Sequence, residues 1–346
     1  MRETPVSVAP ESYPVRPTMS YREKILDPMR ASRLMANGWA AADLHAHSWY
    51  SNDVIPSPQT DPVTMYNAAV EKGFRFVTFT DHDTMHAYDR IGWARDRLVP
   101  GVEIRILDRV RVGHTIHINV YGLDKKQFQE IEAIAQRDRN IDRLVGYLND
   151  NGLDFIYNHP FWCELHEQLS IQSIRDIAPM FPVLEYNRGR IHPLNTEALE
   201  LAEEHGLGLA ASSDTHSGLI GSSYTLAQAA TFPEFFDQLR RGRSLVVPQD
   251  MNVELFSQEI YRYINLIFSE RAGEAEIPGV EQGRDYRFFR RLVQFLIESD
   301  MQKGVVRKKI IRSVFSLVNA LGIPAYIHLR YQRRVVNEIL RFAAEA

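Results

Sequence analysis

Two histidines stand at the end of a short apolar run, in the sequence Asp43-Leu44-His45-Ala46-His47. Alternate residues of an extended strand point to the same side, so His45 and His47 can reach one metal ion while Leu44 and Ala46 turn away. Two histidines at this spacing are a weak signal alone, because many strands carry such a pair by chance. They become informative here because acids and histidines recur at the ends of later apolar runs.

Five later segments carry such residues at or just after a stretch with strand character. They are Thr80-Asp81-His82-Asp83, Gly101-Val102-Glu103, Ile116-His117, Asn158-His159-Pro160 and Ser213-Asp214-Thr215-His216. Imidazoles together with carboxylates suit zinc, manganese or iron, whereas an all-oxygen set would suit magnesium or calcium. The donors are too many for one ion, so we expect two or three neighbouring divalent ions. Such clusters activate water and stabilise both the attacking and the leaving oxygen of a phosphoryl group.

These donors must be positioned by elements that alternate along the chain. Short apolar runs favour strands at 39–44, 74–80, 99–104, 116–121, 154–158, 183–186 and 207–213, with a closing strand at 244–247. Helical patterns lie between them at about 61–72, 84–97, 125–149, 195–205 and 232–241. This alternation favours parallel strands with right-handed crossovers. Since the carboxyl ends of barrel strands converge on one face, we predict an α/β fold, a distorted (β/α)7 TIM-like barrel, with the donors in one pocket.

The chain divides into three predicted parts. Residues 1–38 form an arm and a helix, residues 39–250 form the barrel that carries the metal site, and residues 251–346 form a helical extension. The extension has apolar residues at helical spacing and a basic run, Arg307-Lys308-Lys309. We expect it to pack on the barrel or to form a homodimer through its helices. A surface for an anionic membrane or nucleic acid is the alternative, although blocks of like charge are more often solvated faces.

Composition sets broader limits. The chain has 346 residues, 45% of them hydrophobic and 24% charged, with a net charge of −4, which is ordinary for a globular protein and argues against a generally nucleic-acid-binding surface. A single cysteine, Cys163, excludes an intrachain disulfide, and we expect it to be a buried small side chain and not a nucleophile. No segment resembles a signal peptide or a membrane span, so a cytoplasmic location is expected.

Taken in order, the motifs resemble those of the PHP (polymerase and histidinol phosphatase) domain family. D-L-H-A-H-S resembles the first motif, T-D-H-D the second, G-V-E with I-H-I-N-V-Y-G the third, Y-N-H-P the histidine motif and S-S-D-T-H-S the last. The resemblance covers about residues 40–250. It implies a distorted (β/α)7 barrel and a site for up to three metal ions, used mostly for phosphoester hydrolysis.

Carried over residue by residue, the resemblance also implies three groups of metal ligands. The first ion would be held by His45, His47, Glu103 and Asp214. Glu103 would bridge to a second ion held also by His117 and His159, and His82 and His216 would hold a third. His114 lies three residues before His117 and competes with it, but the motif favours His117.

The chain departs from the family pattern after the first motif. Many relatives have S-D-G where this chain has Ser51-Asn52-Asp53, which leaves two roles open for Asp53: completing the third group of ligands, or capping a turn. The number of ions therefore stays open between two and three.

Four further residues are predicted to take part in catalysis or binding. Asp81 precedes a ligand histidine and is predicted, with Glu103, to be catalytic, either by orienting a ligand or by handling a proton. Glu185, Arg188 and Arg190 lie at or after the end of the sixth strand and are predicted to bind substrate. Guanidinium groups suit bidentate phosphate recognition. The alternative for the two arginines is that they are ordinary loop charges. The alternative for Glu185 is that it orients a metal ligand.

These features lead us to expect a metal-dependent phosphoesterase. A metal-bound hydroxide would attack the phosphorus of a small phosphomonoester or nucleotide, with manganese, zinc or iron as the ion. Three alternatives remain: a PHP-type exonuclease on nucleic acid, a hydrolase of carbon–nitrogen bonds, and a non-catalytic PHP-like interaction protein. Fold resemblance alone does not choose the substrate.

Overall fold

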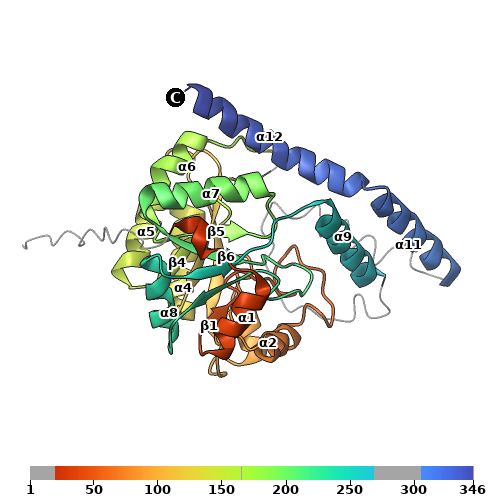
Figure 1. Cartoon of the computed structure of the whole chain (residues 1–346), viewed down its shortest axis with the longest axis horizontal. Helices are drawn as coiled ribbons and strands as arrows, with labels where there is room; N and C mark the ends of the chain where they lie inside the picture. Colours follow the sequence, from red (N-terminus) through yellow and green to blue (C-terminus); the bar gives the residue numbers. More distant parts are fainter. Residues whose placement is uncertain (1–19, 165, 269–304, 346) are drawn as a thin grey trace, which may run out of the picture.

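The computed structural model describes residues 20–164, 166–268 and 305–345. The predicted arm at 1–19 and the helical pattern at 285–302 lie outside the described residues. Within the described part the fold is mixed α/β, with helices packed around two sheets (Figure 1).

The larger sheet has five strands in the order β2-β3-β4-β5-β6. These strands are β2 (Gly101–Leu107), β3 (Thr115–Tyr121), β4 (Asp154–Tyr157), β5 (Val183–Asn187) and β6 (Gly208–Ser212). The smaller sheet has the order β1-β7-β8, from β1 (Ala40–Ala42), β7 (Tyr224–Ala227) and β8 (Leu245–Val247). Nearly every residue of these strands is buried, so both sheets are enclosed by the rest of the chain.

The larger sheet is only partly parallel. β4 pairs with β5, and β5 with β6, in parallel, but β2–β3 and β3–β4 are antiparallel. The expected parallel pairing therefore holds for β4–β5 and β5–β6 and not for β2–β3 or β3–β4. The reason is the short connection at 108–114, which turns the chain back as a hairpin and is too short for the helical crossover that a parallel pair needs.

Helices cover the sheets in the order of the chain. They are η1 (Tyr21–Lys24), α1 (Pro28–Ala36), α2 (Pro62–Glu71), α3 (His86–Ile91), α4 (Lys125–Ala133), η2 (Ile134–Asp138), α5 (Ile141–Asp150), α6 (Ile171–Ile177), η3 (Ala178–Met180), α7 (His192–His205) and α8 (Phe232–Arg240). The predicted start of α2 is confirmed: Asp61 accepts a hydrogen bond from the amide of Thr64, and Pro62 is the first helical residue.

Two predicted helices differ from the structure. The helix expected at 125–149 is broken between η2 and α5, because Arg139 takes a left-handed conformation (φ +50°) and Asn140 caps α5 by accepting from the amide of Arg143. The helix expected at 84–97 is reduced to α3 and ends at Gly92, whose φ of +98° favours glycine. In both cases local backbone chemistry overrides the apolar pattern.

The strand predicted at 74–80 is not a regular strand. It forms a single bridge, Val77 to Leu98, and the amide of Thr80 donates to the carbonyl of Ala46. The phenol of Tyr88, in α3, takes the place of a strand partner: it accepts from the amides of Phe79 and Gly101 and donates to the carbonyl of Phe79. A side chain that satisfies these backbone groups leaves fewer of them for a sheet ladder.

Isolated bridges tie this irregular segment to its neighbours and join the segments that follow β1 and β6. The bridges are Val77–Leu98, His82–Glu103 and Ala46–Thr215. A distorted seven-stranded barrel remains a prediction, because the regular strands by themselves form two sheets.

The helix α8 shows how tightly the covering layer packs. Phe235, Phe236 and Leu239 are fully buried against the sheets. A Cβ atom at Gly208 would collide with the backbone of Leu239, so only glycine lets α8 approach β6 this closely. The packing of α8 thus fixes the strand that leads to Asp214.

After residue 250 the described residues, 251–268 and 305–345, include the helices α9 (Val253–Ile267), α11 (Val305–Ala320) and α12 (Ile323–Glu345). α12 crosses α7, and Val335 and Ile339 of α12 join the main apolar core (Figure 1). α9 packs against both α11 and α12. The predicted packing of this region on the rest of the fold is confirmed for the described residues, whereas a homodimer stays a prediction.

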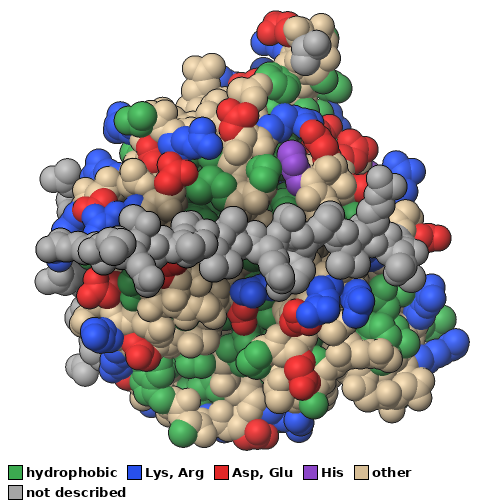
Figure 2. Space-filling model, turned by 90° about the vertical axis from the view of Figure 1, so that its left-hand side faces the viewer, with side chains coloured by type: hydrophobic (Ala, Val, Ile, Leu, Met, Phe, Trp, Pro, Cys, Tyr) green, Lys and Arg blue, Asp and Glu red, His purple; other side chains and the backbone are tan. Residues whose placement is uncertain are grey.

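The surface of the molecule carries charges of both signs. Figure 2 shows lysine, arginine, aspartate and glutamate side chains interspersed over one face, as a net charge of −4 would suggest. Among the described helices none alone is long and apolar enough to cross a membrane, and only a bent pair, 309–320 with 323–345, meets a test of length and composition.

Candidate metal centre

The nine side chains predicted to bind metal lie together in the structure. Their donor atoms form four overlapping groups, within each of which all atoms lie within 4.8 Å of one another. The groups are His45-His47-Asp214, His45-Glu103-His159, His82-Glu103-His117 and His47-Asp53-His82-His216. Residues that are up to 171 positions apart in the sequence, from 45 to 216, thus meet in one place.

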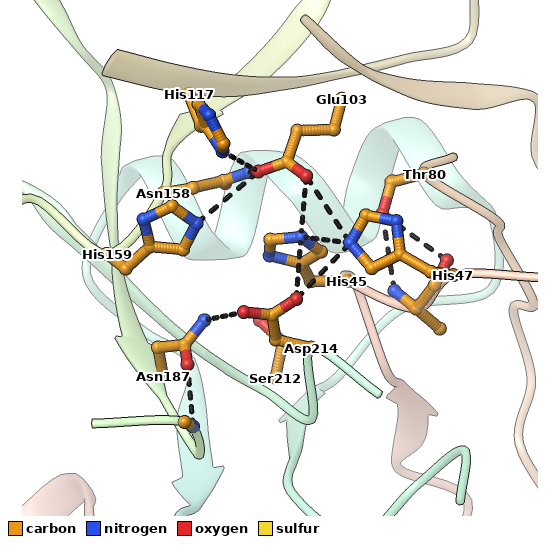
Figure 3. Close-up of polar contacts among 12 residues, drawn as sticks. His45, His47, Thr80, Glu103, His117, Asn158, His159, Asn187, Ser212 and Asp214 are labelled. Atoms are coloured by element: carbon orange, nitrogen blue, oxygen red, sulfur yellow. Dashed lines mark hydrogen bonds and ion pairs between the residues drawn. The ribbon is translucent and has the colours of Figure 1, made fainter. Parts of the chain in front are cut away.

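His45 and His47 both lie close to the carboxylates of Glu103 and Asp214. Nε2 of His45 lies 3.0 Å from Nε2 of His47, 3.2 Å from Oε2 of Glu103 and 3.3 Å from Oδ1 of Asp214. Nε2 of His47 lies 3.3 Å and 3.2 Å from the same two oxygens (Figure 3). The donor types and their spacing fit a divalent transition metal.

The carboxylate of Glu103 lies between two sets of donors. Its Oε2 faces His45 and His47, whereas its Oε1 is 3.0 Å from Nδ1 of His117 and 3.4 Å from Nε2 of His159 (Figure 3). The amide of Asn158 donates to the same Oε1 over 2.8 Å. Each carboxylate oxygen therefore points to a different set of imidazoles, as a bridging ligand would.

Asp53 lies with His82 and His216. Its Oδ2 is 2.9 Å from Nε2 of His216 and 3.3 Å from Nε2 of His82, and Ser51 Oγ donates to its Oδ1 over 2.9 Å. The ring of His47 is 4.3 Å from that of His216, so this set adjoins the first. Of the two roles open for Asp53, the structure places it with the donors.

Hydrogen bonds and unusual backbone conformations hold these segments in place. Asn119 Nδ2 and Tyr121 Oη both donate to the carbonyl of Leu44, which fixes the chain directly before His45. His159 and Asp214 have φ values of +27° and +49°, in a region that non-glycine residues rarely adopt. Each such conformation costs on the order of 1–3 kcal/mol and persists only where the surroundings impose it, which is common at functional sites.

Glu185 holds the donors in place and is fully engaged within the protein. Its Oε1 lies 2.8 Å from Nδ1 of His45 and accepts from Ser212 Oγ, while Oε2 accepts from the amide of His159 and from Asn187 Nδ2. A carboxylate on Nδ1 places the proton there and leaves Nε2 free to bind metal. The structure therefore gives Glu185 an orienting position, and its predicted contact with substrate stays a prediction.

Asp81 supports the turn after the first motif. Its two oxygens accept from the amide and the hydroxyl of Ser48 over 2.6 Å and 2.7 Å. Burial raises the pKa of this carboxyl above its ordinary value. These contacts hold the residue that follows His47, and the ligand-orienting and catalytic roles of Asp81 both stay predictions.

The two arginines differ in their surroundings. Arg188 is buried and pairs with Glu259 over 2.9 Å, and its Nε donates to Gln249 over 2.7 Å. The guanidinium of Arg190 lies 6.0 Å from the ring of Trp162, which in turn is 4.5 Å from the ring of His117. Arg190 is thus the better placed of the two beside the donor groups.

Other histidines and the cysteine lie apart from the donors. His114 is buried and accepts from the amide of Ser170, so the preference for His117 agrees with the geometry. Cys163 is buried, and burial raises the pKa of its thiol, as expected of a side chain that is not a nucleophile. Asp83 follows the ligand candidate His82 and pairs with Arg105 over 2.9 Å.

The pKa values of the buried carboxylates and imidazoles describe the electrostatics of the site. Burial alone would raise the pKa of Glu103, yet the imidazoles of His45, His82 and His117 hold it well below its ordinary value. Burial likewise would lower the pKa of His216, but Asp53 and Asp214 raise it to about 9. Burial lowers the pKa of His117 to about 3, and its buried Nε2 has no hydrogen-bond partner among the described residues. Buried carboxylates facing imidazoles are a suitable environment for divalent ions.

Sequence reasoning missed several supporting residues. Asn158, Asn187, Ser212 and Ser48 donate hydrogen bonds to the acids of the site, and Trp162 packs against two of its histidines. Asn158 and Asn187 stand in the strand-end motifs Y-N-H-P and L-E-Y-N, so adjacency to a ligand or an acid is the signal that could have found them.

No protein-family model and no curated protein matches the sequence. Solved structures give weak similarities. PsfC from Pseudomonas syringae PB-5123 is 16% identical with a TM-score of 0.46, covering 65% of this chain and 98% of its own. A protein from Bifidobacterium adolescentis assigned as a metal-dependent phosphoesterase is 16% identical with a TM-score of 0.40, covering 52% and 91%. The lesion-specific endonuclease PfuEndoQ from Pyrococcus furiosus is 18% identical with a TM-score of 0.42, covering 60% and 57%. At TM-scores below 0.5, these similarities assign neither fold nor function.

Proposed function

We propose that this protein is a PHP-type, metal-dependent phosphoesterase that hydrolyses a small phosphomonoester or nucleotide with two or three divalent ions (manganese, zinc or iron). The observation that carries the proposal is the carboxylate of Glu103, which presents one oxygen to His45 and His47 and the other to His117 and His159. A bridging carboxylate between imidazole groups is the arrangement that a pair of adjacent metal ions needs.

Adjacent divalent ions, when bound, supply an acidic water and charge neutralisation for the oxygens of a phosphoryl group. The side chains of the protein would hold the ions and orient the ligands. Glu185 keeps the proton of His45 on Nδ1, so that Nε2 of His45 faces the metal centre. Arg190 would place a permanent positive charge beside the centre, which suits an anionic substrate.

The same proposal includes the distorted (β/α)7 barrel. The bridge Ala46–Thr215, between the segments that follow β1 and β6, and the bridge His82–Glu103, between the irregular segment and β2, support it, because both lie at donor residues or beside them. In such a barrel the donors would occupy the face at the carboxyl ends of the strands, where barrels carry their chemistry.

The direct test is the release of phosphate or nucleotide by manganese-loaded protein. The panel contains phosphomonoesters, nucleotides and a short single-stranded DNA, and a His45→Ala/His47→Ala double variant serves as the blank. Turnover of small monoesters that the double variant lacks would support the proposal and leave only the choice of substrate.

The other outcomes separate the alternatives. Release from DNA alone would favour an exonuclease. Metal binding with no cleavage anywhere in the panel would favour hydrolysis of carbon–nitrogen bonds, to be checked with amide and cyclic amide substrates. A protein that binds no divalent ion would point to a non-catalytic interaction domain.

A further inference from the structure

Helix α9 lies outside the motifs that carry the metal donors, yet one of its side chains contacts two loops of the site. Oε1 of Glu259 lies 2.9 Å from Nη1 of Arg188, and Oε2 accepts a hydrogen bond from Ser217 Oγ over 2.6 Å. The side chains of Glu259 and Arg188 are only 12% and 6% exposed. An ion pair that is shielded from water in this way is held in one geometry and is costly to break by removing one partner.

The two contacts lead directly to functional side chains. Ser217 follows His216, whose Nε2 is 2.9 Å from Oδ2 of Asp53. Arg188 lies two residues before Arg190, and its amide donates to the carbonyl of Ser212, at the end of β6. One carboxylate from α9 therefore joins the loop after β5 to the loop after β6.

The remaining contacts of α9 keep it in this place. Its Phe256 stacks on His328 of α12 at 4.3 Å, and the carbonyl of Ser257 accepts from Asn319 of α11 over 2.9 Å. α12 also reaches the loop after β5, where Gln332 donates to the carbonyl of Gly189 and accepts from the amide of Ile191. The C-terminal helices thus hold this loop from two sides.

A second residue of α9 lies on the same side of the helix, one turn after Glu259. Burial and the negative charges of Glu259, Asp53 and Asp214 raise the pKa of Tyr263 well above its ordinary value, so this residue lies within the field of the donor groups. Tyr263 also packs against the small apolar cluster of Ile55 and Leu266. These relations place α9 beside the set formed by Asp53, His82 and His216.

We propose that Glu259 is a positioning residue, which through Ser217 holds the loop of His216 in place for a third divalent ion bound by Asp53, His82 and His216. In this view α9 supports the metal centre through the side chain of Glu259. The inference rests on the proposed metal-dependent function, which it extends to the number of ions and to the residues that support the third.

The test measures manganese per chain, by elemental analysis after equilibrium dialysis at graded free manganese, in wild type and three variants. Glu259→Gln keeps the shape of the side chain and removes its charge, and Ser217→Ala removes only the hydroxyl. Glu254→Gln, at an exposed position of the same helix, is the matched control. Changes to residues that support metal ligands typically weaken binding 10- to 100-fold.

We expect the most weakly bound of three ions to lose at least about tenfold in affinity in Glu259→Gln, with a smaller loss in Ser217→Ala. The tighter ions and the Glu254→Gln control should keep wild-type affinity. If Glu259→Gln does not fold, as judged by circular dichroism, Ser217→Ala decides the matter alone.

Three results would overturn the inference: wild-type affinity for every ion in both variants, an equal weakening of all ions, or a wild-type protein that takes up only two. A wild-type protein that takes up no ion would instead refute the proposed function, so the two failures are distinguishable.

Discussion

Nδ1 of His45 lies 2.8 Å from Oε1 of Glu185, and both side chains are fully buried. This contact fixes the tautomer of His45, because the proton is held on Nδ1 by the carboxylate. Such outer partners raise the basicity of a ligand imidazole and restrict its rotation. The geometry of the first donor set therefore depends on a residue that does not belong to it.

Replacing Glu185 by glutamine should weaken metal binding without unfolding the protein. We expect the affinity of the tightest ion to fall about 10- to 100-fold, because a neutral amide holds the proton of His45 less strongly. Competition with a metal-binding dye measures this affinity. Glu200→Gln, on the exposed side of α7, is the matched control. Equal affinities in the two variants would contradict the role assigned to Glu185.

Removing both histidines of the first motif should abolish metal-dependent activity. In His45→Ala/His47→Ala the first donor set loses two of its four atoms, so we expect loss of at least one ion per chain and a fall in turnover of more than about 100-fold. Elemental analysis and a phosphate-release assay measure the two effects. His86→Ala removes a half-exposed imidazole from α3 and should change neither. A double variant with full metal content would rule out the first site.

The sequence predicts the donor residues well because strand ends constrain them strongly. His45 and Asp214 each stand where an apolar run stops, whereas Glu103 lies inside β2, and both carboxylates face Nε2 of His45. Their identity is visible because imidazoles and carboxylates at such places have few other uses. The α2 cap at Asp61 was predictable for a similar reason, since Asp-Pro at a helix start has a local mechanism.

Other features depend on partners that are distant in the sequence. The irregular backbone at 74–80 follows from the phenol of Tyr88, and no local pattern announces that a side chain will replace a strand. Glu185 contacts four donors, one from its own strand and three from other segments of the chain, so its orienting role could not be separated from substrate binding by sequence alone. Glu259 lies beyond the motifs, in a stretch that reads as an ordinary amphipathic helix.

The metal-free protein should lose stability as the pH rises above neutrality. The pKa of His216 is about 9 in the fold against an ordinary 6.5, so its contribution is fully present below pH 6.5 and is lost as the pH rises towards 9. A shift of this size corresponds to a free energy of unfolding on the order of 3 kcal/mol. Glu103 and Asp214 have lowered pKa values, so their contribution is present above about pH 4 and is lost as the pH falls.

We therefore expect the melting temperature of chelator-treated protein to be highest near pH 5–6 and to fall towards pH 9. Manganese-loaded protein should instead hold or gain stability over the same range, because ions and protons compete for the imidazoles. Scanning calorimetry with and without chelator measures both trends. His216→Ala is the internal control, since the decline above pH 6.5 should be shallower in that variant. Parallel curves for the two forms of the wild type would contradict the assignment.

Asp53 decides whether the site holds two ions or three. Its Oδ2 lies between Nε2 of His82 and Nε2 of His216, so Asp53→Asn should remove the charge that joins these imidazoles. We expect the variant to bind one ion fewer than wild type, with the two tighter ions and the fold unchanged, and to lose turnover by about 10- to 100-fold. Elemental analysis counts the ions. Asn52→Ala, at the neighbouring position of the same loop, is the control, since it leaves every carboxylate and imidazole of the donor groups in place. If Asp53→Asn kept the full number of ions, the carboxylate would serve the loop through Ser51 and the site would be binuclear.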